Sequence, residues 1–166
     1  HLNLSSFSSG LVESELFGHI KGAFTGATGD KGGALNEADR GTLFLDEIDS
    51  ISKDLQVKLL LFLDNGQYRP VGGHGVKKSN ARIIFASGSN LEDLVGSGEM
   101  RRDFFFRLKS GVNLRLKPLR EDKEKIVSLC KFFANTKNVF VSNELIESYQ
   151  KLNFLPCSEQ KTQFLL

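Results

Sequence analysis

Two adjacent carboxylates, Asp46 and Glu47, directly follow the short apolar run at residues 42–45. Such a run is typical of a buried strand, and ligands bind at the carboxyl ends of strands in open α/β sheets. One carboxylate can hold Mg²⁺ there, and the next can orient and polarise an attacking water. This is the Walker B arrangement of nucleotide hydrolases. A solvated strand end followed by a helix cap is the alternative that the pair alone leaves open.

A stretch rich in Gly and Ala at residues 18–29 surrounds Phe24 and Thr25. Phosphate cradles need Gly for close backbone approach, but a phosphate-binding loop reads G-x-x-x-x-G-K-[ST]. That string is absent, since Lys21 and Lys31 are each followed by Gly. The stretch is therefore interpreted as a contact tip for a macromolecule, with an ordinary surface loop as the alternative.

Arginines flank three consecutive phenylalanines in the segment MRRDFFFRL at residues 100–108. In a ring of identical subunits, an arginine such as Arg101 or Arg107 can reach the γ-phosphate bound by a neighbour and stabilise its charge. A core helix with solvated arginines and stacking on nucleic acid are the two alternatives.

The elements that must position these groups follow from periodicity. Apolar runs predict strands at residues 42–45, 82–86 and 112–116, and residues 1–4 fit the end of another strand. Apolar residues at helical spacing predict helices over 55–63 and 100–108. Strands that alternate with helices favour a parallel α/β sheet whose strands are buried on both faces.

Beyond Pro118 the chain contains no Gly, and its pattern turns helical. Helices are predicted over 121–133 and from Ser142 to Leu152, and a third is predicted from Pro156. The predicted buried faces comprise Ile126, Leu129, Cys130 and Phe133 on the first helix, and Leu145, Ile146, Tyr149 and Leu152 on the second. We expect a small helical subdomain here.

Composition excludes several classes of protein. The 166 residues are 40% hydrophobic and carry a net charge of +2, which suits one domain with a small appendage rather than a disordered chain. No apolar run approaches the roughly 20 residues of a membrane span. The 22 basic residues nearly balance the 20 acidic ones, which argues against a strongly basic nucleic-acid binder. Cys130 and Cys157 lack C-x-x-C spacing, so neither a disulfide framework nor structural zinc is expected, and a reducing compartment fits.

Several segments together resemble bacterial enhancer-binding activators of sigma-54 RNA polymerase, the NtrC-like proteins. Residues 13–19 (ESELFGH) and 21–27 (KGAFTGA) are similar to the signature of that family. Residues 41–48 (GTLFLDEI) resemble its Walker B segment, and residues 55–60 and 71–73 fit the stretch that follows. The resemblance covers nearly the whole chain.

The resemblance implies a three-layer, parallel-sheet AAA+ core at residues 1–117, followed by a partial helical lid at 118–166. It implies ATP and Mg²⁺ as ligands, a homo-oligomeric ring, usually hexameric, and remodelling of the sigma-54 polymerase closed complex. It also implies a cytoplasmic protein, often a two-component response regulator, with no membrane partner. DNA would be held only by a domain outside this chain, because no helix-turn-helix pattern follows.

The resemblance also implies roles for single residues. Asp46 would bind Mg²⁺, Glu47 would activate water, and Asn3 would switch Glu47 according to the bound nucleotide. Arg101 and Arg107 match the arginines that act on the neighbour, and Ser87 falls in the segment that senses the γ-phosphate. The residues expected to contact sigma-54 are Gly22, Ala23, Phe24, Thr25, Gly26 and Ala27, with residues 68–80 as a second, supporting insertion.

Four departures from the family bear on activity. The phosphate loop of the family precedes Asn3 and is absent here, so we expect a cut through a larger protein and no turnover by these residues alone. Gly88 stands where a sensor amide is usual, Arg102 where an acid is usual, and Gln160 where a sensor arginine is usual. The alternative is a divergent, hydrolysis-impaired regulator that binds sigma-54 or sister subunits. The intact Asp46 and Glu47 argue against a pure interaction module.

Overall fold

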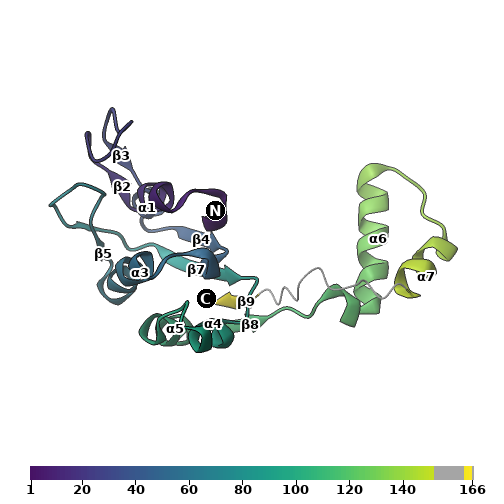
Figure 1. The fold of residues 1–166 in the computed structure, drawn as a ribbon. Coiled ribbons are helices and arrows are strands. Elements are labelled where there is room, and N and C mark those ends of the chain that lie inside the picture. The colour runs from purple at the N-terminus through teal and green to yellow at the C-terminus, as the bar shows by residue number, and fades with distance from the viewer. Residues whose placement is uncertain (152–162, 166) are drawn as a thin grey trace. The chain divides into compact units, whose positions relative to one another are not determined.

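A computed structural model describes residues 1–151 and 163–165 (Figure 1). The chain divides into two compact units, residues 1–114 together with the strand at 163–165, and a second unit that begins at Arg115. Each unit is described by itself below. None of the helices in the described residues combines the length and apolar character that crossing a membrane requires.

Three short parallel strands form the central part of the sheet: β1 (Leu2–Asn3), β4 (Thr42–Asp46) and β7 (Arg82–Ser87). Asn3 lies opposite Asp46, and Leu45 lies opposite Phe85. The predicted strands at 42–45 and 82–86 and the predicted parallel sheet are thereby confirmed. The register brings the carboxyl ends of the three strands to one edge.

Two further strands complete the sheet, in the order β1-β4-β7-β9-β8. β9 (Gln163–Leu165) pairs antiparallel with β7, so the expectation of an all-parallel sheet is wrong at this position. β8 (Asn113–Arg115) is exposed along its length, which corrects the expectation that every strand is buried on both faces. β8 is the last strand of the sheet, and an edge strand has a neighbour on one side only.

Helices and short elements connect the strands of the first unit. The predicted helices over 55–63 and 100–108 are confirmed as α3 and α5. In α3, the Ser52 side chain caps the first turn by accepting from the Leu55 N–H, and Gly66 ends the helix with φ 71°. The helices are α1 (Ser9–Phe17), α2 (Ala34–Glu37), α3 (Lys53–Asn65), α4 (Leu91–Ser97) and α5 (Arg102–Lys109). The short elements are η1 (Leu4–Ser6), β2 (Gly18–His19), β3 (Lys31–Gly32), η2 (Ile48–Ser50), β5 (Gln67–Tyr68) and β6 (Lys77–Lys78).

The core of this unit lies between the sheet and its helices. Leu45 of β4, Leu59 of α3, Leu91 of α4 and Phe104 of α5 belong to one buried cluster and are fully inaccessible to solvent. Each such side chain contributes about 1.5–3 kcal/mol by leaving water. The alternation along β4, with Leu43 and Leu45 buried, fixes which way this strand faces and therefore where its acidic end points.

The second unit contains η3 (Leu119–Glu121), α6 (Lys123–Lys137) and α7 (Asn143–Lys151). The two predicted helices are confirmed, but their buried faces are narrower than expected. Ile126 and Ile146 are buried, whereas Phe133, Leu145 and Tyr149 are 57%, 47% and 40% exposed. α6 packs against α7 and η3, and α7 packs against α6, so only a narrow stripe of each helix is covered. The predictions at Leu152, Pro156 and Gln160 lie outside the described residues.

Tyr68 carries a polar group without a partner in the core. The side chain is 5% exposed between the rings of Phe17 and Phe62, and its hydroxyl makes no hydrogen bond within the described residues. Burial, and secondarily the charge of Asp39, raises the pKa of Tyr68. A buried hydroxyl without a hydrogen bond loses its hydration without compensation.

We expect Tyr68→Phe to stabilise the fold by about 1 kcal/mol, because it removes this unpaired hydroxyl and retains the ring contacts. Denaturant unfolding of the two proteins measures the difference. Leu59→Ala is the control for sensitivity and should cost about 2–5 kcal/mol. A Tyr68→Phe protein less stable than the wild type would show that the hydroxyl is satisfied.

Candidate functional site

The carboxyl edge of the sheet is formed by the ends of β1, β4 and β7. The Asp46 carboxylate, at the end of β4, accepts a hydrogen bond from the Glu47 N–H at 3.0 Å through Oδ1. Its other oxygen lies 3.7 Å from Nε2 of His1. The side chain is about one-third exposed, so it is oriented by its partners yet open to a ligand.

Glu47 adopts a left-handed backbone conformation, with φ 57° and ψ 47°. This conformation is costly for a residue with a Cβ, and such residues often occur at functional sites. The backbone carbonyl of Glu47 accepts from the N–H and hydroxyl of Ser50, at 2.9 and 2.7 Å, which holds the turn. Partial burial, and then the charges of Asp49 and Asp46, raises the pKa of the Glu47 carboxyl.

A link that sequence reasoning missed joins Asp49 to the end of β7. The Ser89 hydroxyl donates to Oδ2 of Asp49 at 2.5 Å, and the Ser89 N–H donates to the Ser87 hydroxyl at 3.2 Å. Oδ1 of Asp49 is buried and has no hydrogen-bond partner among residues 1–151 and 163–165. Ser87, predicted as a sensor, therefore connects to the acidic strand end through Ser89. Asp49 and Ser89 lie 40 residues apart, so no local pattern could indicate their pairing.

Asn3 lies at the same edge but is engaged elsewhere. Its side-chain oxygen accepts from the N–H and hydroxyl of Ser5, at 3.0 and 2.8 Å, and so caps η1. Within the described residues, no hydrogen bond joins Asn3 to Glu47. The predicted switch between these two side chains stays a prediction.

The donor set at this edge suits Mg²⁺ chemically. The carboxylates of Asp46 and Glu47 are hard oxygen donors, and the charge of Asp49 acts on Glu47 beside them. Mg²⁺ is commonly held by one or two carboxylates together with substrate phosphates, so a complete protein cage is not required. Among the described residues, no three His, Cys, Asp or Glu side chains gather to hold a metal alone. The edge thus supplies carboxylates for a metal and a water, but no phosphate cradle.

The predicted contact loop connects β2 to β3. The Gly22 N–H donates to the Ala27 carbonyl at 2.8 Å, which closes the loop around its tip. The ring of Phe24 meets the His19 ring edge-on, with centroids 5.0 Å apart. Nδ1 of His19 lies 2.7 Å from the buried Ser14 hydroxyl, so α1 fixes the ring on which Phe24 rests. Thr25 is exposed at the tip.

The second predicted insertion packs against this loop, and Figure 1 shows the two beside each other at one end of the unit. The Ile20 N–H donates to the Val71 carbonyl at 3.1 Å, and the Val71 N–H donates to the Gly18 carbonyl at 2.8 Å. Gly72 has φ 73° and lies so close that an added Cβ would be 2.7 Å from the Cβ of Ala23. The two insertions therefore form one structure.

Arg101 lies at the start of α5 and pairs within its own subunit. Its Nε and Nη2 donate to the Asp103 carboxylate at 3.0 and 2.7 Å. The pair raises the pKa of Arg101 and lowers the pKa of Asp103. The Arg101 N–H donates to the buried Gln56 side chain at 2.9 Å, which ties the start of α5 to α3.

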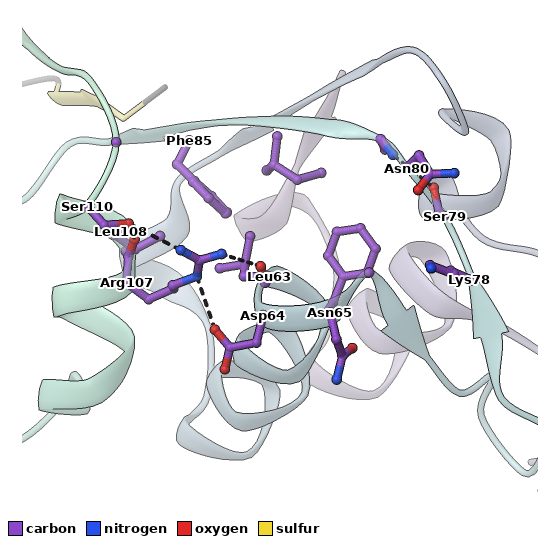
Figure 2. Close-up of a pocket in the computed structure, with 15 residues that line it drawn as sticks. Leu63, Asp64, Asn65, Lys78, Ser79, Asn80, Phe85, Arg107, Leu108 and Ser110 are labelled. Atoms are coloured by element: carbon purple, nitrogen blue, oxygen red, sulfur yellow. Dashed lines mark hydrogen bonds and ion pairs between the residues drawn. The ribbon is translucent and has the colours of Figure 1, made fainter.

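Arg107 extends from α5 toward the end of α3 and borders a cavity of about 620 Å³ (Figure 2). Its Nη2 donates to the Leu63 carbonyl, its Nε lies 3.1 Å from the Asp64 carboxylate, and its Nη1 donates to Ser110 at 3.4 Å. These partners belong to α3 and to the residue after α5, not to the carboxyl edge. The structure therefore does not bring Arg101 and Arg107 together with Asp46 and Glu47 within one chain.

Comparison with known proteins identifies the family to which this fold belongs. The sigma-54 interaction domain family matches residues 1–114. The chain belongs to this family. The resemblance inferred from GAFTGA and the acidic strand end is thereby confirmed. The DNA-binding transcriptional regulator NtrC of Escherichia coli K12 is 47% identical over 132 residues, which is 80% of this chain and 28% of NtrC. The Nif-specific regulatory protein of Rhodobacter capsulatus is 47% identical over 137 residues, 82% of this chain and 24% of that protein.

Solved structures agree with the fold. A crystal structure of NtrX from Brucella abortus in complex with ADP has a TM-score of 0.80 and 31% identity, covering 92% of this chain and 34% of NtrX. The NtrX complex with ATP has a TM-score of 0.73 and 34% identity, covering 81% of this chain and 28% of NtrX. The predicted α/β fold class is confirmed. This sigma-54 interaction domain chain spans about a quarter to a third of the length of these relatives.

The contact between the two insertions can be tested with a pair of glycines. We expect Gly72→Ala to loosen the contact loop, because the new Cβ meets Ala23 and the left-handed backbone costs about 1–2 kcal/mol. Gly75→Ala is the matched control, since its Cβ would enter open space. Limited proteolysis within residues 22–27 should be faster for Gly72→Ala alone. Equal cleavage of both variants would contradict the contact.

Proposed function

We propose that this chain is the central part of a sigma-54-dependent activator. In that protein, ATP hydrolysis between the subunits of a ring would move residues 22–27 against sigma-54. The observation that supports this most is the path of chain connections and hydrogen bonds that joins the acidic strand end to the loop. β4 leads through η2 into α3 and β5, and Val71 beyond β5 is bonded to the β2 hairpin that carries the loop. This path connects Glu47, where hydrolysis is proposed to occur, to Phe24 in the loop that is proposed to move.

In this proposal, Asp46 holds Mg²⁺, and Glu47 orients and deprotonates the attacking water. The raised pKa of Glu47 suits a group that must accept a proton during the reaction. ATP with Mg²⁺ supplies the transferable phosphoryl group and neutralises its charge. Ser87 and Asn3 are proposed to contact the nucleotide from the neighbouring strand ends, where both residues lie.

The two arginines are proposed to act on the nucleotide of an adjacent subunit. Arg101 is 43% exposed and Arg107 is 39% exposed, and each pairs with a carboxylate other than Asp46 or Glu47. A homo-oligomeric ring, with six subunits as in the family, provides the neighbour. We further propose a cytoplasmic protein, of the two-component regulator type, that holds DNA through a domain beyond these residues. Residues 22–27 would contact sigma-54.

The second candidate function is a sigma-54-binding or subunit-binding regulator that hydrolyses ATP poorly. Gly88 favours it, because Gly offers no amide to report the γ-phosphate. The hydrogen bond between Ser89 and Asp49 favours the ATPase instead, because it supplies another link between the end of β7 and the acidic turn.

Glu47→Gln separates binding from hydrolysis. In the full-length activator we expect ATP binding to persist and turnover to fall by about 10²-fold or more, because an amide cannot accept the proton of the attacking water. Phosphate release and nucleotide binding, measured on the same preparation, check this. Glu37→Gln, an exposed carboxylate on α2, is the control. Hydrolysis at the wild-type rate by Glu47→Gln would remove Glu47 from the mechanism.

Thr25→Ala tests the contact loop. We expect ATPase activity to remain and sigma-54 capture to be lost in a pull-down with a transition-state analogue, because Thr25 is exposed at the loop tip. Thr28→Ala lies just outside residues 22–27 and should capture sigma-54 normally. If Thr25→Ala retains as much sigma-54 as the wild type, the contact role is rejected.

A further inference from the structure

Each of the three guanidinium nitrogens of Arg107 lies against a group of its own subunit (Figure 2). Nη2 donates to the Leu63 carbonyl, Nη1 to Ser110, and Nε faces the Asp64 carboxylate at 3.1 Å. A guanidinium recognises phosphate through the same N–H groups. In this arrangement the contacts to Leu63, Asp64 and Ser110 compete with a phosphate for the guanidinium of Arg107.

The end of α3 explains why the arginine lies there. The last carbonyls of a helix lack helical partners and carry partial negative charge. Leu63 and Asp64 belong to the final turn of α3, which contains no basic residue of its own. Asp64 adds a full negative charge to this already negative end. Arg107, reaching across from α5, compensates both groups.

The contact between Arg107 and Asp64, called the clamp below, can nevertheless open. Asp64 is 57% exposed and Arg107 is 39% exposed, so both charges can return to water without a large desolvation cost. The Nε atom is buried and makes an ion pair with Asp64, but the two are not aligned as a hydrogen bond.

We propose that Asp64 is a positioning residue that holds Arg107 on its own subunit. It thereby sets how readily Arg107 becomes available to a neighbouring subunit. This inference rests on the proposed trans-acting role of Arg107 and adds its regulation. The Asp64–Arg107 contact competes with subunit assembly, so weakening the contact favours productive association.

The test is ATP turnover as a function of protein concentration in the full-length activator. With Asp64→Asn, we expect half-maximal turnover at a concentration about two- to fivefold lower, with the maximal rate unchanged. This range follows because an exposed ion pair contributes up to about 1 kcal/mol, and 1.4 kcal/mol is a factor of ten. Asp64→Glu retains the charge and should resemble the wild type. Asp54→Asn, an exposed carboxylate in the first turn of the same helix, is the matched control.

A second measurement tests the clamp without relying on ATP turnover. The buried Nε–H of Arg107 should give a slowly exchanging ¹H–¹⁵N signal in the wild-type activator, assigned through Arg107→Lys, and Asp64→Asn should accelerate its exchange. Unchanged exchange in Asp64→Asn would overturn the clamp. If exchange accelerates but wild-type turnover shows no concentration dependence, the trans-acting role of Arg107 fails instead. If turnover curves of wild type and Asp64→Asn coincide, the clamp has no regulatory effect and the proposal is rejected.

Discussion

Parallel pairing of β4 with β1 on one side and β7 on the other places the candidate residues of the acidic strand end. The pairing brings the carboxyl ends of three strands to one edge, with Asn3 opposite Asp46 in register. A shift of one residue in β4 would turn its buried leucines to the opposite face. Burial of Leu43 and Leu45 therefore fixes the direction in which Asp46 and Glu47 leave the sheet.

α3 connects the acidic turn at this edge to Arg107 and to the insertion that packs on the contact loop. The helix begins just after the acidic turn and ends beside Arg107, and the chain then continues into the insertion that packs on the contact loop. Its core side chains Leu55, Leu59 and Phe62 hold it against the sheet. A displacement of α3 would therefore affect the acidic turn, the arginine and the loop at once. This gives the proposed coupling of hydrolysis to loop movement a physical route.

The periodic spacing of apolar residues predicted much of the fold. The spacing of leucines predicted α3, and the apolar runs predicted β4 and β7, whereas the functional role predicted for the acidic pair stays a prediction. The failures lie where the result depended on distant partners. β9 pairs with β7 across some 80 residues of sequence, and Phe133 stays exposed because α6 has few neighbours to cover it. Neither outcome leaves a signal in the local pattern.

The amino-acid sequence by itself determined the family, the elements with a clear apolar period, such as α3, α5, β4 and β7, and the identity of the carboxylates, arginines and loop residues that are proposed to act. It could do so because short apolar periods and a dense motif such as GAFTGA are encoded within a few neighbouring residues. Only the tertiary structure decided which of those groups meet. It showed that Ser89 bonds Asp49, that the ring of His19 contacts that of Phe24, and that Asp64 forms an ion pair with Arg107. These contacts arise because sheet register and helix packing bring together residues that are separate in the chain, and no local pattern of residue types specifies that geometry.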